Sequence, residues 1–76
     1  IGTSKKINAI KAPMPGLILE INIEVGDDVK ENDDLLILEA MKMENVIKAA
    51  GNGVVKEILV KNQDAVEKNQ VLIEME

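Results

Sequence analysis

Apolar and polar residues alternate with a period of two along residues 17–25. The apolar positions of this segment are Leu17, Leu19, Ile21, Ile23 and Val25. Glu20, Asn22 and Glu24 occupy the positions between them, and only Ile18 adds an apolar residue to the polar side. A period of two places alternate side chains on opposite faces of a β-strand. The pattern therefore predicts a half-buried strand over residues 17–25.

The same hydrophobic pattern occurs twice in the chain. When the sequence is shifted by 37 residues, residues 7–39 align with residues 44–76, and 12 of the 33 aligned pairs are identical. Other pairs exchange one apolar residue for another, such as Leu17 with Val54 and Leu36 with Ile73. The matches run from end to end, so the chain consists of two similar halves that should fold alike. Only residues 40–43 lie between the two copies.

Turn-forming residues recur at matching places in the two halves. Residues 27–33 and 64–70 are rich in Asp and Asn, which favour turns. Asn32 and Asn69 occupy equivalent positions, where we expect the left-handed backbone conformation that Asn tolerates. Pro13 and Pro15 are expected at a strand edge or in a turn. Further short strands are expected at 35–39 and 71–75.

Residues 35–50 carry a conflicting local signal. They are rich in good helix formers, Asp34 could cap a helix at its start, and Gly51 could end it. The duplication favours strands instead, because residues 44–50 match a segment that contains Pro13, and a helix would break the symmetry. We therefore predict two strands joined by a tight turn at Met41 and Lys42. Neither residue suits a turn with positive φ, and such departures from local preference cluster at functional sites.

The composition excludes several kinds of chemistry. The chain has 76 residues without Cys, His, Phe, Trp or Tyr, so its small core must consist of aliphatic residues and Met. Without Cys and His there is no disulfide, no thiol nucleophile and none of the commonest zinc ligands. The acidic pairs Asp27-Asp28 and Asp33-Asp34 lack the spacing of an EF-hand calcium loop, so we assign them to turns. No glycine-rich phosphate loop is present.

The charge and the ends of the chain add weaker expectations. The formal net charge of −5 argues against nucleic acid and anionic membranes as partners. No apolar run is long enough for a membrane span, and residues 1–6 lack the apolar core of a signal peptide. We expect residues 1–6 to be a tether or linker remnant, residues 7–76 to form one monomeric domain, and its location to be cytoplasmic.

Residues 39–44, Glu-Ala-Met-Lys-Met-Glu, resemble the attachment motif of biotinyl domains, the biotin carboxyl carrier modules of biotin-dependent carboxylases and decarboxylases. The resemblance extends over nearly the whole chain. Residues 12–16 resemble the proline-rich opening turn of the family, residues 25–29 its Gly-Asp turn, and residues 51–53 its second glycine turn. Asn32, Asn69 and Gln63 depart from the family pattern, but these positions concern turn geometry and lie outside the motif.

The resemblance implies the fold and the cofactor. It implies an all-β, flattened β-barrel or sandwich of two four-stranded antiparallel sheets with quasi-two-fold symmetry, similar to a hammerhead. Lys42 would lie on a tight hairpin turn, and a biotin protein ligase would join biotin to it from biotinyl-AMP. The biotin would carry CO2 between a biotin carboxylase, or a decarboxylase, and a carboxyltransferase. The domain itself would be non-catalytic, because the cofactor does the chemistry and other domains catalyse.

The residues around Lys42 would form the recognition context of the attachment site. Met41 and Met43 are adaptable apolar side chains that suit changing partners, although Met43 could equally serve packing. Ala40 would allow close approach at the turn. Glu39 matches Glu76 in the other half and could end a strand or contact the ligase. Glu44 completes the motif.

Two alternatives stay open from the sequence. The first is a lipoyl domain of the same fold, although that family generally has Asp-Lys-Ala around its lysine. The second is an unmodified adaptor that binds proteins through its acidic surface.

The chain lacks the loop insertion of some acetyl-CoA carboxylase carriers, so it looks more like carriers of acyl-CoA or oxoacid carboxylases and sodium-pumping decarboxylases.

Overall fold

The structure, a computed structural model, describes residues 6–76, which form eight β-strands and no helix. The strands are β1 (Ala9–Lys11), β2 (Gly16–Ile21), β3 (Asp28–Val29), β4 (Asp34–Ala40), β5 (Met43–Lys48), β6 (Gly53–Ile58), β7 (Ala65–Val66) and β8 (Val71–Met75). The helix signal of residues 35–50 is therefore overridden, and the predicted hairpin is confirmed. Residues 1–5 of the predicted tether lie outside the described residues.

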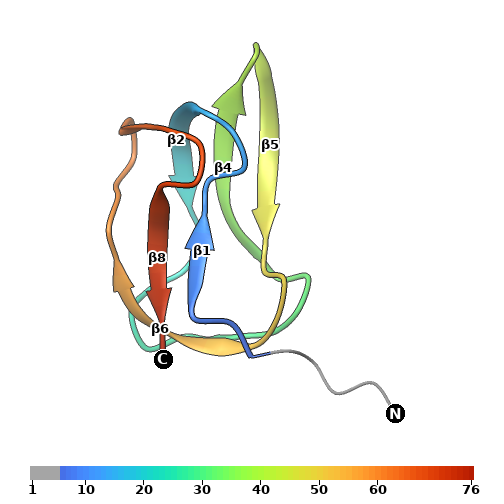
Figure 1. Cartoon of the computed structure of the whole chain (residues 1–76), viewed down its shortest axis with the longest axis vertical. Helices are drawn as coiled ribbons and strands as arrows, with labels where there is room; N and C mark the ends of the chain where they lie inside the picture. Colours follow the sequence, from blue (N-terminus) through green and yellow to red (C-terminus); the bar gives the residue numbers. More distant parts are fainter. Residues whose placement is uncertain (1–5) are drawn as a thin grey trace.

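The strands form two four-stranded antiparallel sheets that face each other (Figure 1). One sheet has the order β1-β8-β6-β3 and the other β5-β4-β2-β7. A shift of 37 residues maps each strand of the first sheet onto a strand of the second. Each sheet thus takes strands from both halves of the chain, and this exchange makes the two halves one flattened sandwich with quasi-two-fold symmetry. The predicted fold class is confirmed.

The symmetry extends to individual hydrogen bonds. The backbone N–H of Ile18 donates to the carbonyl of Asp64 at 2.9 Å, and the equivalent N–H of Val55 donates to Asp27 at 3.0 Å. The Asp27 carboxylate accepts a bond from the N–H of Glu24, and the Asp64 carboxylate accepts the equivalent bond from Lys61. These aspartates therefore stabilise equivalent turns, as the sequence predicted for Asp27.

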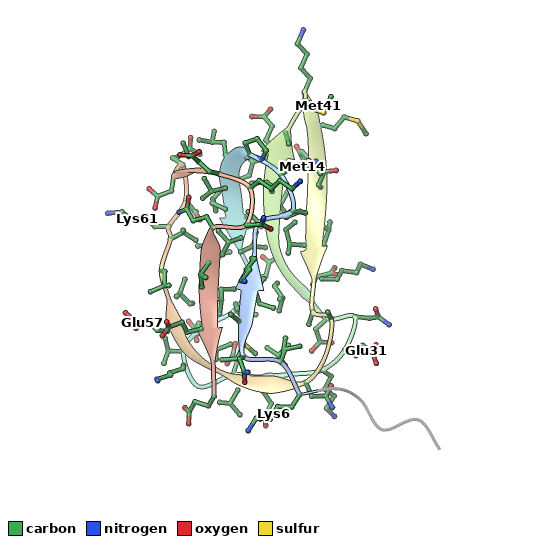
Figure 2. The ribbon with its side chains drawn as sticks, in the orientation of Figure 1. Lys6, Met14, Glu31, Met41, Glu57 and Lys61 are labelled. Atoms are coloured by element: carbon green, nitrogen blue, oxygen red, sulfur yellow. The ribbon has the colours of Figure 1, made fainter. Side chains whose placement is uncertain are left out.

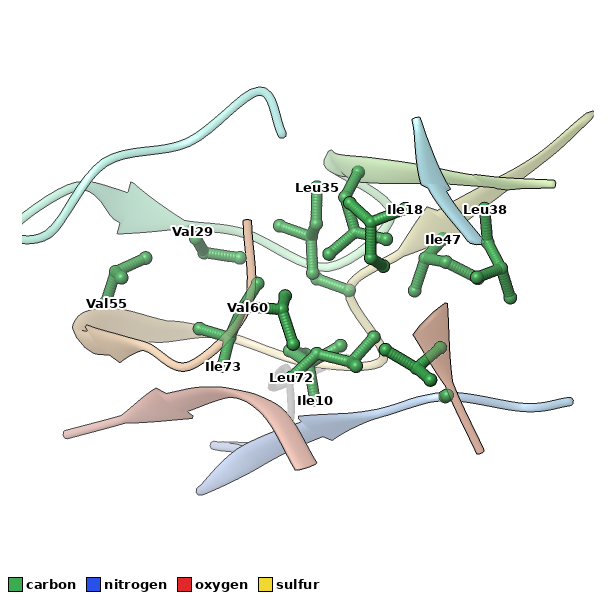
Figure 3. Packing of buried hydrophobic residues seen from close by; sticks show 14 of the residues in the cluster. Ile10, Ile18, Val29, Leu35, Leu38, Ile47, Val55, Val60, Leu72 and Ile73 are labelled. Carbon is green, nitrogen blue, oxygen red and sulfur yellow. The ribbon is translucent and has the colours of Figure 1, made fainter. Parts of the chain in front are cut away.

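Aliphatic side chains from both sheets fill the space between them (Figure 3). The largest fully buried side chains are Ile18, Leu35, Leu36, Leu38, Val55, Leu72 and Ile73. Most of these positions form equivalent pairs in the two halves, such as Leu35 with Leu72. No described residue of this core is polar or charged. Burial of apolar area, at about 25 cal/mol per Å², is the main force that holds the two sheets together.

Two predicted boundaries are wrong. The strand predicted over residues 17–25 ends at Ile21, because the chain then crosses to the other sheet, where the N–H of Gly26 bonds the carbonyl of Val55. The alternation continues past the strand because Ile23 packs against the core, while Val25 is 62% exposed. The segment 27–33, predicted as turn, contains the short strand β3.

The predictions for the asparagine turns and for the two prolines are confirmed. Asn32 and Asn69 have φ of 74° and 69°, in the left-handed region. Pro13 and Pro15 lie in the connection between β1 and β2. No helix among residues 6–76 is long and apolar enough to cross a membrane.

Candidate functional site

Lys42 lies in the turn of the β4–β5 hairpin, at one end of the long axis of the molecule (Figure 1). Ala40 pairs directly with Met43, so only Met41 and Lys42 form the turn. Both have positive φ, 54° and 64°, as a type I′ turn requires. Asn and Gly are the usual residues of such turns, so Met and Lys hold this conformation at a conformational cost.

The core accounts for this turn in a segment with helical preferences. Leu36, Leu38 and Ala40 are alternate residues of β4, and all three are buried. A strand places alternate residues on one face, so all three can face the core. Their partners on β5 include Ile47, which is also buried. Tertiary packing therefore decides the conformation of the hairpin, and helix propensity is the weaker term.

The side chains near the tip of the hairpin divide into buried and exposed ones. Ala40 is buried, with 6% exposure. Met41 and Met43 are 89% and 64% exposed, and Lys42 is exposed. Met41 and Lys6 lie at opposite ends of the molecule in Figure 2. The hairpin thus presents two large apolar side chains and one amine to solvent.

The charges around Lys42 are not arranged as ion pairs. Glu39 and Glu44 are exposed and lie directly opposite each other on β4 and β5, a pairing of like charges that costs stability. Within residues 6–76 the one ion pair joins Lys48 and Asp34, at 3.8 Å and more than half exposed. No described carboxylate is therefore in ion-pair contact with Lys42, and its amine is sterically accessible.

Two residues that the motif does not include position the hairpin. The side-chain amide of Asn45 donates to the carbonyl of Met43 at 3.3 Å and to that of Leu38 at 3.4 Å. Gly16 lies against the backbone of Glu39, where a Cβ would overlap the carbonyl oxygen. The sequence placed Gly16 only within the segment that resembles the proline-rich opening turn, and it gave Asn45 no role. The identity of Asn45 with Asn8 in the duplication was the available signal.

Other features of the described residues do not converge on Lys42. A hollow of about 250 Å³ is lined by residues 28–30 and 52–54. Asn52 forms a bridge with Lys6, so this hollow lies at the end of the molecule away from the hairpin. Residues 6–76 contain no group of three acidic residues arranged to hold a metal ion. The prominent feature near the tip is a protruding amine, the nucleophile that an activated acyl group requires.

A family model described as "Biotin-requiring enzyme" matches residues 8–75 of the chain. The chain therefore belongs to the biotin/lipoyl attachment family. It is a carrier domain rather than a catalyst, and its cofactor is biotin. The resemblance inferred from residues 39–44 is confirmed at the level of the family.

Two curated relatives show where such domains occur. The biotin carboxyl carrier protein of Streptococcus mutans is 58% identical over 43 residues, which cover 57% of this chain and 33% of that protein. The glutaconyl-CoA decarboxylase subunit gamma of Acidaminococcus fermentans is 61% identical over 36 residues, which cover 47% of this chain and 25% of that subunit. The matched segments thus span a quarter to a third of these relatives.

Solved structures agree with the fold. The urea carboxylase of Kluyveromyces lactis contains a similar domain, with a TM-score of 0.81 and 29% identity; the match covers 99% of this chain and 7% of that one. The lipoyl domain of the 2-oxoglutarate dehydrogenase complex from Azotobacter vinelandii has a TM-score of 0.76 at 24% identity, covering 92% of this chain and 96% of that domain. At this identity the second likeness supports the fold alone.

Proposed function

We propose that Lys42 is the residue to which biotin is attached, and that the domain carries a carboxyl group on this biotin. The observation that carries the proposal is the turn itself. Met41 and Lys42 hold positive φ where Asn or Gly would be less strained, in the one segment that the duplication does not explain. Strain that persists at an exposed site is typical of function.

The proposed modification is a single acyl transfer. The Nζ of Lys42 attacks the acyl carbon of biotinyl-AMP, an amide bond forms, and AMP and a proton leave. A biotin protein ligase would supply the adenylate. Lysine suits this role because it joins a nucleophilic amine to a flexible four-carbon stem. The absence of a described ion pair at Lys42 leaves the amine free to react.

The remaining residues of the motif would form the recognition surface for the ligase and for the partner enzymes. Met41 and Met43 provide adaptable apolar contacts, Ala40 allows the strands to approach, and Glu39 and Glu44 provide negative charge. The like-charge pair costs stability in the free domain, so a basic partner surface would relieve it. Relief of this repulsion would favour binding of a basic partner surface at Glu39 and Glu44.

The rigid sandwich and the flexible arm would then act together as a swinging carrier. Lysine and the biotin chain reach on the order of 10 Å beyond the backbone. Tethering replaces diffusion between two active sites with a high effective concentration. We propose that these sites are a biotin carboxylase, or a decarboxylase, and a carboxyltransferase that acts on an acyl-CoA or oxoacid. The relatives from carboxyl carriers and an acyl-CoA decarboxylase support this class of acceptor.

Two alternatives make different predictions. A lipoyl domain has the same fold, but the Met-Lys-Met sequence here differs from the Asp-Lys-Ala that is usual around lipoyl lysine. An unmodified adaptor would tolerate Lys42→Ala in the complete assembly.

The cytoplasmic location and the monomeric state of the isolated domain stay predictions.

The experiment is co-expression of the 76-residue chain with a biotin protein ligase, followed by intact-mass measurement. We expect the mass to increase by one biotinyl group, and the Lys42→Arg variant to show no increase. An unmodified wild-type chain would contradict the proposal.

A further inference from the structure

The outer face of the β5-β4-β2-β7 sheet carries an apolar strip beside the hairpin. Residues that lie directly opposite each other in an antiparallel sheet share a face. Val46 on β5 lies opposite Ile37 on β4. Leu17 on β2 lies opposite Glu39, which is two residues after Ile37 on β4 and therefore on the same face. We define Val46, Ile37 and Leu17 as the outer strip. Val46 is 46% exposed, and Ile37 and Leu17 are half-buried.

The duplication provides an internal comparison for this strip. In the other sheet, Ala9 and Glu74 occupy the positions equivalent to Val46 and Ile37, and they pair in the same register. The fold therefore accommodates a glutamate and an alanine at these two places. The architecture therefore does not require the Ile37–Val46 pair. Isolated exposed apolar residues need no explanation, but an adjacent pair with a polar counterpart does.

Carboxylates surround the outer strip. Glu20 lies opposite Ile37, while Glu39 and Glu44 form the next cross-strand pair toward Lys42. Lys48 is the next residue on this face of β5. Its Nζ lies 3.8 Å from the Oδ1 of Asp34, which offsets the positive charge. A complementary surface would present an apolar centre with Lys or Arg around it.

The position of the strip relative to Lys42 selects the kind of partner. Val46 lies four residue positions after Lys42, about 14 Å along a strand at ~3.4 Å per residue. An unmodified lysine extends only about 6 Å from its backbone. An enzyme that acylates it must therefore approach the hairpin closely, and its surface would continue down β5 and β4. Enzymes that use the finished biotin arm reach the cofactor from further away.

We propose that the outer strip is the docking surface for the ligase that biotinylates Lys42, through an apolar patch of the ligase surrounded by basic side chains. The proposal rests on Lys42 being the attachment site. It adds a surface outside residues 39–44 that determines how tightly the unmodified domain binds. Substitutions in the strip should therefore raise KM, because they weaken the complex between the ligase and the unmodified domain. They should leave kcat nearly unchanged.

The test compares substitutions on the two equivalent faces. The Ile37→Glu and Val46→Thr variants are assayed for initial rates of biotinylation with a purified biotin protein ligase, biotin, Mg²⁺ and ATP, at varied concentrations of the 76-residue chain. The matched control is Glu74→Ile, which introduces an isoleucine at the equivalent position of the other sheet. Val46→Thr keeps the β-branched shape and the strand propensity, so it serves if Ile37→Glu does not fold.

We expect KM to rise about tenfold for Ile37→Glu and severalfold for Val46→Thr, with kcat within twofold of wild type, as for the loss of a central interface contact. The Glu74→Ile variant should keep the wild-type KM. If both strip variants fold and keep the wild-type KM, the docking proposal is wrong while Lys42 stands as the attachment site. If the wild-type chain is not biotinylated, both proposals fail. A fall in kcat at unchanged KM would also contradict docking.

Discussion

Gly16 of β2 lies against the carbonyl oxygen of Glu39 on β4, three residues before Lys42. A Cβ at Gly16 would overlap this oxygen and lie 3.1 Å from both Cγ and Cδ1 of Leu38. Because the obstructing atom belongs to the backbone, it cannot move without shifting the strand that leads to the turn. This contact fixes the end of β4 nearest the turn against the neighbouring strand.

We expect Gly16→Ala to destabilise the domain by about 2–3 kcal/mol, the upper part of the range for overpacking. The free energy of unfolding is measured by urea titration. The matched control is Gly53→Ala in the other half, where the closest atom is the terminal methyl group of Met75, at 3.0 Å. The Met75 side chain is flexible and can move, and the carbonyl oxygen of Ile7, at 3.3 Å, is much less crowded than the Glu39 oxygen, so the control should lose about 1 kcal/mol or less. Equal losses would contradict the assigned contact.

The strain in the turn can be measured at Met41. We expect Met41→Asn to raise the free energy of unfolding by about 1 kcal/mol, because Asn tolerates the left-handed conformation. The rate of biotinylation should fall, since an exposed apolar contact is removed. Met43→Asn is the control: Met43 is in β5 without positive φ, so Asn should lower stability there. A stability loss in Met41→Asn would contradict the assignment of strain to this turn.

The two halves differ informatively at Gln63, which occupies the position of Gly26. Both residues have positive φ, 76° and 95°. We expect Gln63→Gly to stabilise the domain by about 0.5–1 kcal/mol, since glycine adopts this conformation without a steric cost. The measurement is the urea midpoint.

The converse substitution, Gly26→Gln, is the partner experiment. No atom lies within 4 Å of a Cβ at Gly26, so any loss of stability would come from the backbone conformation alone. We expect a loss of about 1 kcal/mol. If both substitutions left the midpoint unchanged, positive φ would not be a cost in these turns.

The sequence supported much of the fold because the duplication corrected the local signals. Residues 35–50 favour a helix when considered alone, and only their equivalence with other segments predicted β4, β5 and the turn between them. The pairing of the other strands could not be predicted from the sequence. That β1 lies next to β8 and β7 next to β2 follows from how the two halves exchange strands, and no local preference encodes this arrangement.

The candidate site shows the same division. The motif predicted Lys42 and its neighbours as the site, and positive φ at Asn32 and Asn69 followed from residue chemistry. The hydrogen bonds of Asn45 and the contact of Gly16 depend on three-dimensional proximity across strands. The length of β2 was overestimated because Ile23 continues to face the core after the strand has ended.

Biotinylation should change the charge of the domain in a predictable way. The amide bond removes the positive charge of Lys42, so the formal net charge changes from −5 to −6. We expect the modified form to elute later from an anion-exchange column than the unmodified form. The Lys42→Arg variant should give one peak before and after incubation with the ligase. An added peak in that variant would place the modification on another lysine.

The site and the chemical identity of the modification distinguish a biotin carrier from a lipoyl carrier. The 76-residue chain is offered to a biotin protein ligase and a lipoate protein ligase together, with both acids present, and the product is digested and mapped by tandem mass spectrometry. We expect a biotinyl group on Lys42 and unmodified lysine elsewhere. A lipoyl group on Lys42, or biotin on a different lysine, would contradict the account.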